Sequence, residues 1–185
     1  MKQIRSHLPP RRRSNWLAGI HLVPLLVLLH AGTAGAHLMP SGHARLNITD
    51  DGIFAVFALG ESSFAAADSD GDDVVSLTEL DRYRSALIAT IEQALWVEVD
   101  GQRHAIEDVL LNPAHDHGEA SPGVESLTVL GRFAVDASAA ENLFLGIDYA
   151  LLDAGELEIR ARRGAAPRRA PRTLSRESSV LRLLP

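Results

Sequence analysis

Apolar and polar residues alternate along several short segments of the chain, which is the pattern of β-strands with one buried face. Two pairs of such segments flank an Asp-Gly turn: residues 45–49 and 53–59 around Asp50-Asp51-Gly52, and residues 95–99 and 102–111 around Asp100-Gly101. Asp-Gly between two β-prone segments is a strong short-range hairpin signal, because both residues readily adopt the backbone conformation of a tight turn. The pattern therefore predicts two β-hairpins.

Three later segments, residues 126–135, 142–152 and 156–160, continue the series of predicted strands. Between the hairpins, over residues 77–94, the apolar period changes to that of a helix. One stripe at helical spacing holds Leu77, Leu80, Tyr83, Leu87, Ile91 and Leu95. These features predict a mainly β (α+β) fold, an antiparallel β-sandwich with one amphipathic helix inserted between its strands.

Two segments predict no regular structure. Residues 112–123 are rich in proline, glycine and polar side chains, which is typical of a loop. Residues 161–185 contain prolines and seven arginines. We expect them to form an arginine-rich, largely disordered tail, so that the folded domain spans residues 37–160.

The first 36 residues have the three parts of a secretion signal. Residues 1–16 contain five basic residues and no acidic one, residues 17–29 are mostly apolar, and Ala34-Gly35-Ala36 ends a run of small residues. We expect this signal peptide to be cleaved after Ala36 and the protein to be periplasmic or secreted. The alternative is an uncleaved N-terminal anchor, since the apolar stretch approaches the roughly 20 residues that span a bilayer.

Charge is divided unevenly along the rest of the chain. Residues 37–159 hold 23 acidic residues and five arginines, a net charge of −18, whereas residues 160–185 hold eight arginines and one glutamate. Clustered basic residues are attracted to acidic surfaces. Because an exported protein does not meet nucleic acid, we expect the tail to bind an envelope protein, an anionic membrane surface or the acidic body of the chain itself.

Residues 68–79 read Asp-Ser-Asp-Gly-Asp-Asp-Val-Val-Ser-Leu-Thr-Glu, which matches the calcium loop of an EF-hand. Calcium takes six to eight oxygen ligands, and such a loop aims alternate side chains at one point while its last glutamate closes the site. The predicted calcium ligands are Asp68, Asp70, Asp72, the backbone carbonyl of Val74, Ser76 and Glu79.

Position 6 of the loop departs from the pattern. It is normally glycine, because the backbone there has a positive φ, and here it is Asp73. Aspartate tolerates this conformation at some cost, so we expect weaker calcium affinity but not loss of the site. Phe64, Leu77 and Leu80 flank the loop where an EF-hand places packing residues. The predicted EF-hand insertion therefore spans about residues 61–95.

A single loop of this kind limits the functions that the chain can serve. Sensor EF-hands open a methionine-rich groove, and this chain has two methionines. We therefore expect calcium to act as a structural clip in a binding or interaction module. An enzyme is not expected, because the sequence has no G-x-S-x-G, H-E-x-x-H or P-loop motif and no cysteine.

Histidines supply a second metal hypothesis. Cleavage after Ala36 would make His37 the first residue, and His115-Asp116-His117 lies in the predicted loop. An N-terminal amine and imidazole can chelate Cu(II) together with a loop histidine, in an arrangement resembling the histidine brace of exported copper carriers. The alternative function is therefore a periplasmic copper- or zinc-binding carrier that uses His37, His115 and His117.

Several segments together resemble one family. They are the expected mature start at residues 36–40, the early strand pair at residues 45–59, the loop 68–79 with residues 80–88 after it, and the late segment 143–153. In these segments the chain is similar to the extracytoplasmic N-terminal region of bacterial HupE/UreJ-like membrane proteins. The resemblance covers roughly residues 36–153 and implies a signal peptide and a β-rich domain with an inserted calcium loop. Family members continue into a multi-helix membrane part that this sequence does not match, so no transport role is carried over.

Overall fold

Strands are the main regular structure of the described residues, as the alternating pattern predicts. The computed structural model describes residues 39–114, 123–166 and 170–183, all within one structural unit, Leu38–Pro185. The predicted signal peptide 1–36 and the histidines His37, His115 and His117 lie outside the described residues. The structure therefore bears on the predicted sandwich, the calcium loop and most of the arginine-rich tail.

Ten strands, one α-helix and two short 3-10 turns make up the described residues. In chain order they are β1 (His43–Ile48), β2 (Ile53–Gly60), η1 (Glu61–Ser63), η2 (Ala65–Ala67), α2 (Leu77–Ala94), β3 (Leu95–Val99), β4 (Gln102–Ala105), β5 (Glu107–Ala114), β6 (Ser126–Phe133), β7 (Leu143–Ile147), β8 (Leu157–Arg163), β9 (Arg172–Leu174) and β10 (Val180–Arg182).

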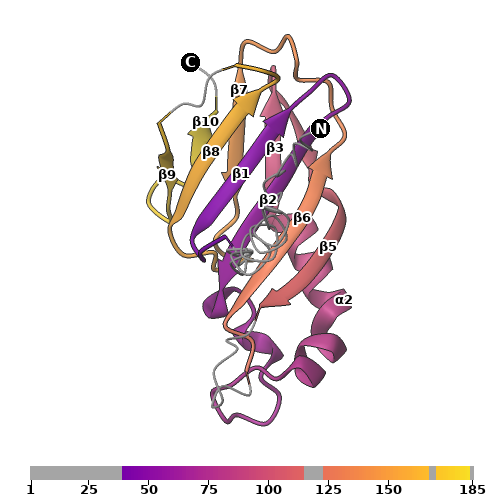
Figure 1. Cartoon of the computed structure of the whole chain (residues 1–185), viewed down its shortest axis with the longest axis vertical. Coiled ribbons are helices and arrows are strands. Elements are labelled where there is room, and N and C mark those ends of the chain that lie inside the picture. Colours follow the sequence, from indigo (N-terminus) through magenta and orange to yellow (C-terminus); the bar gives the residue numbers. More distant parts are fainter. Residues whose placement is uncertain (1–38, 115–122, 167–169, 184–185) are drawn as a thin grey trace, which may run out of the picture. The chain divides into compact units, whose positions relative to one another are not determined.

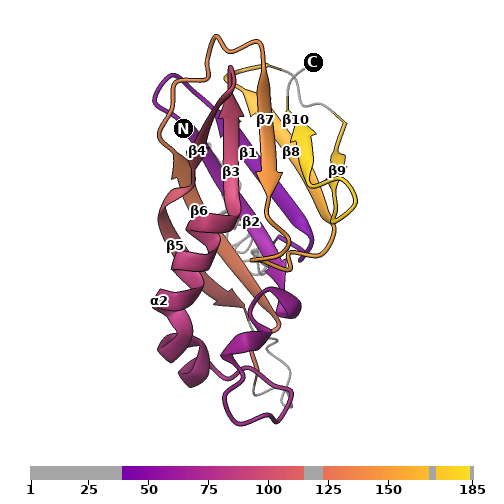
Figure 2. The same cartoon turned by 180° about the vertical axis from the view of Figure 1, so that it is seen from behind.

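The strands form two sheets. The six-stranded sheet has the order β5-β6-β2-β1-β8-β9 and the four-stranded sheet has the order β10-β7-β3-β4. Figure 1 shows the six-stranded sheet from its outer side, and Figure 2 shows the four-stranded sheet and α2 from the opposite side. Helix α2 packs beside β3, β4 and β5. The fold is therefore the predicted β-rich, sandwich-like α+β fold.

The hydrophobic core lies between the two sheets and includes one face of most strands. Ile53 and Phe57 of β2 are fully buried from the six-stranded sheet, and Leu143 and Leu145 of β7 are fully buried from the four-stranded sheet. The period of two along each strand is what places these residues on one face. Both predicted hairpins, β1–β2 and β3–β4, are confirmed as antiparallel pairs.

Helix α2 spans the predicted residues 77–94. Its apolar stripe is buried at Leu80, Leu87 and Ile91, none of which is more than 1% exposed. Leu77, which was predicted on the same stripe, is 48% exposed and does not belong to the core. The helix is therefore anchored from its first turn, at Leu80, to its C-terminal end.

The predicted strand 102–111 is wrong in one respect, because the chain changes sheets within it. Strand β4 belongs to the four-stranded sheet, β5 belongs to the six-stranded sheet, and Ile106 between them is 2% exposed. The side chain of Ile106 fills the space above Gly131 of β6, where a Cβ would lie 2.7 Å from Ile106 Cδ1. Strand β5 also runs to Ala114, so the first three residues of the predicted loop 112–123 are strand.

The sandwich is not wholly antiparallel, contrary to the prediction. Strand β1 pairs with β8 in parallel, with Arg45 opposite Arg160 and Asn47 opposite Arg162. This pairing joins segments more than a hundred residues apart in the sequence, and the alternation of single strands carries no information about their direction. Every other strand pair in the described residues is antiparallel.

The prediction of a largely disordered tail at residues 161–185 was wrong for most of its length. Strand β8 continues to Arg163, β9 pairs with β8 in one sheet, and β10 pairs with β7 in the other. Leu174, Leu181 and Leu183 are buried in the core. These leucines supply the apolar burial that a disordered segment lacks, so the C-terminal segment closes one edge of the sandwich.

Candidate metal centre

The predicted calcium loop lies between η2 and α2, at the end of the helix that points away from β3 (Figure 1). The segment before the loop is two 3-10 turns and not the entering α-helix of a full EF-hand. It is held by buried Phe64, which is 1% exposed, and by the Ser63 hydroxyl, which donates to the Asp153 carbonyl at 2.8 Å. The segment that leads into the loop is therefore held in place on the sandwich.

Backbone amides of the loop donate to its own carboxylates. Gly71 N–H and Asp73 N–H donate to the two carboxylate oxygens of Asp68, at 2.8 Å and 3.1 Å. Asp70 and Asp72 each accept from the amide two residues further on, at 3.3 Å and 2.9 Å. Such bonds are typical of aspartate in turns, and here they wind the chain around the carboxylates.

Asp73 has a φ of +63°, which is the left-handed conformation that position 6 of a calcium loop requires. Aspartate is among the few residues other than glycine that adopt this region readily. The expectation that Asp73 takes the place of the usual glycine in the turn is therefore confirmed.

Three carboxylates meet inside the loop. Oxygens of Asp68, Asp70 and Glu79 lie within 4.8 Å of one another. The neighbouring carboxylate of Asp72 raises the pKa of Asp70, and Glu79 and Asp68 add to this in smaller measure. Negative charge is thus concentrated at one point, with no cationic side chain paired to these three groups in the described part of the chain.

Glu79 is the most firmly held of the three carboxylates and is only 7% exposed. Its Oε1 accepts from the amide and hydroxyl of Ser69, at 2.9 Å and 2.8 Å, and its Oε2 accepts from the amide and hydroxyl of Ser76, at 3.0 Å and 2.8 Å. These donors, led by the Ser76 amide, lower the pKa of Glu79 to about 2. With the Glu79 amide donating to Ser76 Oγ, the pair forms the capping box that starts α2.

A contact from outside the loop fixes its second half. Val75 is 1% exposed and its carbonyl accepts from the Val124 amide at 2.8 Å, while Ser76 forms a bridge with Gly123. A Cβ on Gly123 would lie only 2.5 Å from Val74 Cγ1, so glycine is required for this approach. Val75, the β-branched residue at position 8 of the loop, is the one local sign of this clamp in the sequence.

The predicted ligands fall into two groups. Asp68, Asp70 and Glu79 are brought together, whereas Asp72 and Ser76 form hydrogen bonds within the loop. Asp72 accepts from the Val74 amide and the Ser76 hydroxyl donates to Glu79. The three gathered carboxylates form a group that could hold a metal ion, and in the described residues it is the one group of three or more possible metal-ligating side chains.

The described residues include no helix that is both long and apolar enough to cross a membrane. The predicted N-terminal signal or anchor and the proposed histidine site are not among these residues. No protein-family model matches the chain, and no curated protein is significantly similar to it in sequence.

Proposed function

We propose that this protein binds one calcium ion in the loop 68–79 and that the ion acts as a structural clip in a binding or interaction module. The observation that carries the proposal is the convergence of Asp68, Asp70 and Glu79, whose oxygens lie within 4.8 Å of one another. The left-handed backbone at Asp73 supports it further, because it is the turn that this loop needs to wrap a cation.

The chemistry of the donors favours calcium over other metals. All three gathered side chains are carboxylates, which are hard oxygen ligands, and the loop offers no nitrogen or sulfur donor. Zinc and copper prefer imidazole and thiolate, and magnesium requires a smaller octahedral cage and gives up its water reluctantly. Asp72, the Val74 carbonyl and Ser76 are the further oxygens that would complete a site for six or more ligands.

The position of the loop explains how a bound ion would stabilise the fold. The loop joins η2 to α2, and Val75 ties it to Gly123-Val124, just before β6. A cation would remove the repulsion among the carboxylates at the point where α2 begins. Because calcium would bind the folded loop only, its binding free energy would add to the free energy of unfolding.

Titration calorimetry on the purified protein tests the site. We expect a single calcium site, with weaker binding of magnesium. Glu79→Gln and Asp68→Asn should each weaken calcium binding by at least about tenfold, because each removes a charged oxygen ligand. Glutamine still satisfies the capping-box pattern, so Glu79→Gln should keep the start of α2 intact.

Asp51→Asn is the matched control, since Asp51 is an exposed carboxylate in the turn between β1 and β2. It should leave calcium affinity unchanged. Calcium binding that persists at full affinity in both Glu79→Gln and Asp68→Asn would show that the loop is not the site.

We propose further that the protein works outside the cytoplasm. The support is the order of basic, apolar and small residues in positions 1–36, and calcium sites of extracellular modules are commonly weak and constitutively filled. The intact mass of the protein from a periplasmic extract should correspond to a chain that begins at His37. A mass that includes residues 1–36 would contradict cleavage.

A further inference from the structure

The outer side of the six-stranded sheet carries a groove of about 360 Å³. Residues of β1, β2 and β8 line it: Arg45, Asn47, Phe54, Val56, Arg160 and Arg162. We call this the outer groove. Its volume lies within the range of small-molecule sites, which combine an apolar lining with a few polar groups.

Strand register places the lining in two rows across the sheet. Val56, Arg45 and Arg160 lie directly opposite one another on β2, β1 and β8. Phe54, Asn47 and Arg162 form the second row, one step along the strands. Each row therefore passes from an apolar residue on β2 to an arginine on β8.

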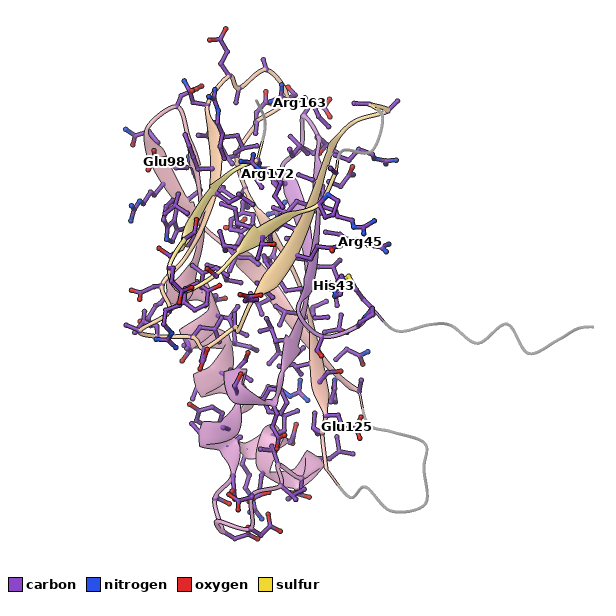
Figure 3. All side chains as sticks on the ribbon, turned by 90° about the vertical axis from the view of Figure 1, so that its left-hand side faces the viewer. His43, Arg45, Glu98, Glu125, Arg163 and Arg172 are labelled. Atoms are coloured by element: carbon purple, nitrogen blue, oxygen red, sulfur yellow. The ribbon has the colours of Figure 1, made fainter. Side chains whose placement is uncertain are left out.

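Two of the three arginines of the outer groove have no acidic partner among the described residues. Arg45 projects from the outer side of the sheet (Figure 3), and neither Arg45 nor Arg162 forms an ion pair with any described residue. Arg160 pairs with Glu158 at 2.8 Å. Like charges placed directly opposite on neighbouring strands destabilise a sheet, so the pair Arg45 and Arg160 costs stability that a bound anion would offset.

Asn47 lies between these arginines and adds a polar group without a partner. Its Oδ1 is buried and accepts no hydrogen bond from the described residues. A buried amide oxygen in this state is unfavourable unless something donates to it. After a flip of the side chain, the amide NH₂ takes the place of Oδ1 and can donate to an anionic head group.

The apolar side of the outer groove continues along the first row. Val56 lies opposite Leu130 of β6, and Leu130 lies opposite Leu110 of β5. Leu130 and Leu110 are 40% and 67% exposed, and neighbouring Phe54 is 46% exposed. Three strand spacings separate Arg45 from Leu110, about 14 Å, so an apolar strip leads away from the arginines.

We propose that the outer groove binds a single-chain anionic amphiphile, such as a long-chain carboxylate. Its head group would lie at Arg45, Arg160 and Arg162, which suit a carboxylate because guanidinium groups bind it with paired hydrogen bonds. Its chain would lie on Phe54 and Val56 and extend toward Leu130. This site is independent of the calcium loop, which lies at the far end of α2.

The observations favour one small molecule over a membrane surface. Residues 37–185, which include Arg160 and Arg162 of the groove, carry a net charge of −11, so an anionic bilayer would repel the protein as a whole. The groove offers a local cluster of arginines and a limited volume, which suit a single head group. An acidic peptide would satisfy the arginines but would leave the strip from Phe54 to Leu110 without an apolar partner.

Dodecanoate below its micelle concentration is the probe, titrated by calorimetry in calcium-free buffer because calcium precipitates such carboxylates. We expect saturable binding of one molecule, at least about tenfold weaker in the double variant Arg45→Gln, Arg162→Gln, since hydrogen bonds to charged groups are the stronger ones. Phe54→Ser should also weaken binding by about tenfold through loss of apolar contact. The matched control Arg82→Gln, an exposed arginine of α2, should leave it unchanged.

Four comparison ligands separate the alternatives. Acetate, which lacks the chain, and dodecylammonium, which lacks the anionic head, should bind at least about tenfold more weakly than dodecanoate. Tighter association with phosphatidylglycerol vesicles or with polyglutamate would overturn the proposal in favour of a membrane or an acidic polypeptide. Absence of dodecanoate binding by the folded protein, or equal binding by all variants, would also overturn it. As a second readout, dodecanoate should shift the side-chain amide signals of Asn47 in NMR spectra of the wild-type protein.

Discussion

Two charged segments of this protein are stabilised in opposite ways. The loop 68–79 holds five of the acidic residues, and most of its hydrogen bonds run to amides and hydroxyls of the loop itself. The C-terminal segment 160–183 holds arginines that reach distant parts of the chain. Arg163 donates to the carbonyls of Ala137 and Ala140, at 3.1 Å and 2.6 Å, and Arg176 pairs with Asp153 at 3.3 Å.

The arginines Arg163 and Arg176 have partners elsewhere in the fold, whereas the gathered carboxylates of the loop have no cationic partner among the described residues. Arg182 likewise donates to the Glu141 carbonyl and to Asn142 Oδ1. Arg163, Arg176 and Arg182 therefore act within the molecule. In the loop, three carboxylates face one another without a cationic side chain, which is the arrangement expected of a cation site.

The largest expected effect comes from the core contact of the C-terminal segment. Leu174 of β9 is fully buried, so Leu174→Ala should lower the free energy of unfolding by about 3 kcal/mol. Urea denaturation measures this. Val180→Ala, at a 45% exposed position of the same segment, should cost less than about 1 kcal/mol. Equal small losses in both variants would mean that the segment is not part of the folded core.

The clamp between the loop and β6 should have the next largest effect. Gly123→Ala places a methyl group 2.5 Å from Val74 Cγ1, and we expect a loss of about 2 kcal/mol in stability together with weaker calcium binding. Gly60→Ala is the control, because its Cβ would have no atom within 4 Å and its φ is −80°. If Gly123→Ala behaves like Gly60→Ala, the loop is held by its own hydrogen bonds alone.

A smaller effect concerns Tyr149, which the C-terminal segment covers. Burial raises the pKa of Tyr149 to about 12, and its hydroxyl donates to the Gly155 carbonyl at 2.9 Å. The unfolded chain loses this proton near pH 10, so the folded state binds more protons above that value. Stability should therefore fall as the pH rises from about 10 toward 12.

Tyr149→Phe should be about 1 kcal/mol less stable at neutral pH, through loss of the hydrogen bond, and should show a smaller decline between pH 10 and 12. Guanidinium denaturation across this range makes the comparison. A decline of the same size in Tyr149→Phe would assign it to other groups.

Local signals in the sequence predicted a large part of the fold and the site. The turns at Asp50-Asp51-Gly52 and Asp100-Gly101 predicted both hairpins, and the helical period predicted α2 from residue 77 to residue 94. The spacing of Asp68, Asp70 and Glu79 predicted the carboxylate group. Each of these features depends on residues that are close in the sequence, so a single sequence contains the information.

The features that were missed depend on contacts between distant segments. The parallel pairing of β1 with β8, the change of sheet at Ile106 and the clamp between Val75 and Val124 leave no periodic signal. Strands β9 and β10 have three residues each, too few for alternation to be recognised. Leu174 and Leu181 are buried, but the many arginines around them in the sequence are typical of an exposed segment.

The most direct test of the calcium clip is chemical unfolding with and without calcium, at one ionic strength so that plain screening is constant. Calcium at ten times its dissociation constant should raise the free energy of unfolding of the wild-type protein by about 1.4 kcal/mol. Glu79→Gln, measured at the same calcium concentration, should gain little or nothing relative to chelator. Equal stabilisation of the wild-type protein and Glu79→Gln would contradict the assignment of the ion to this loop.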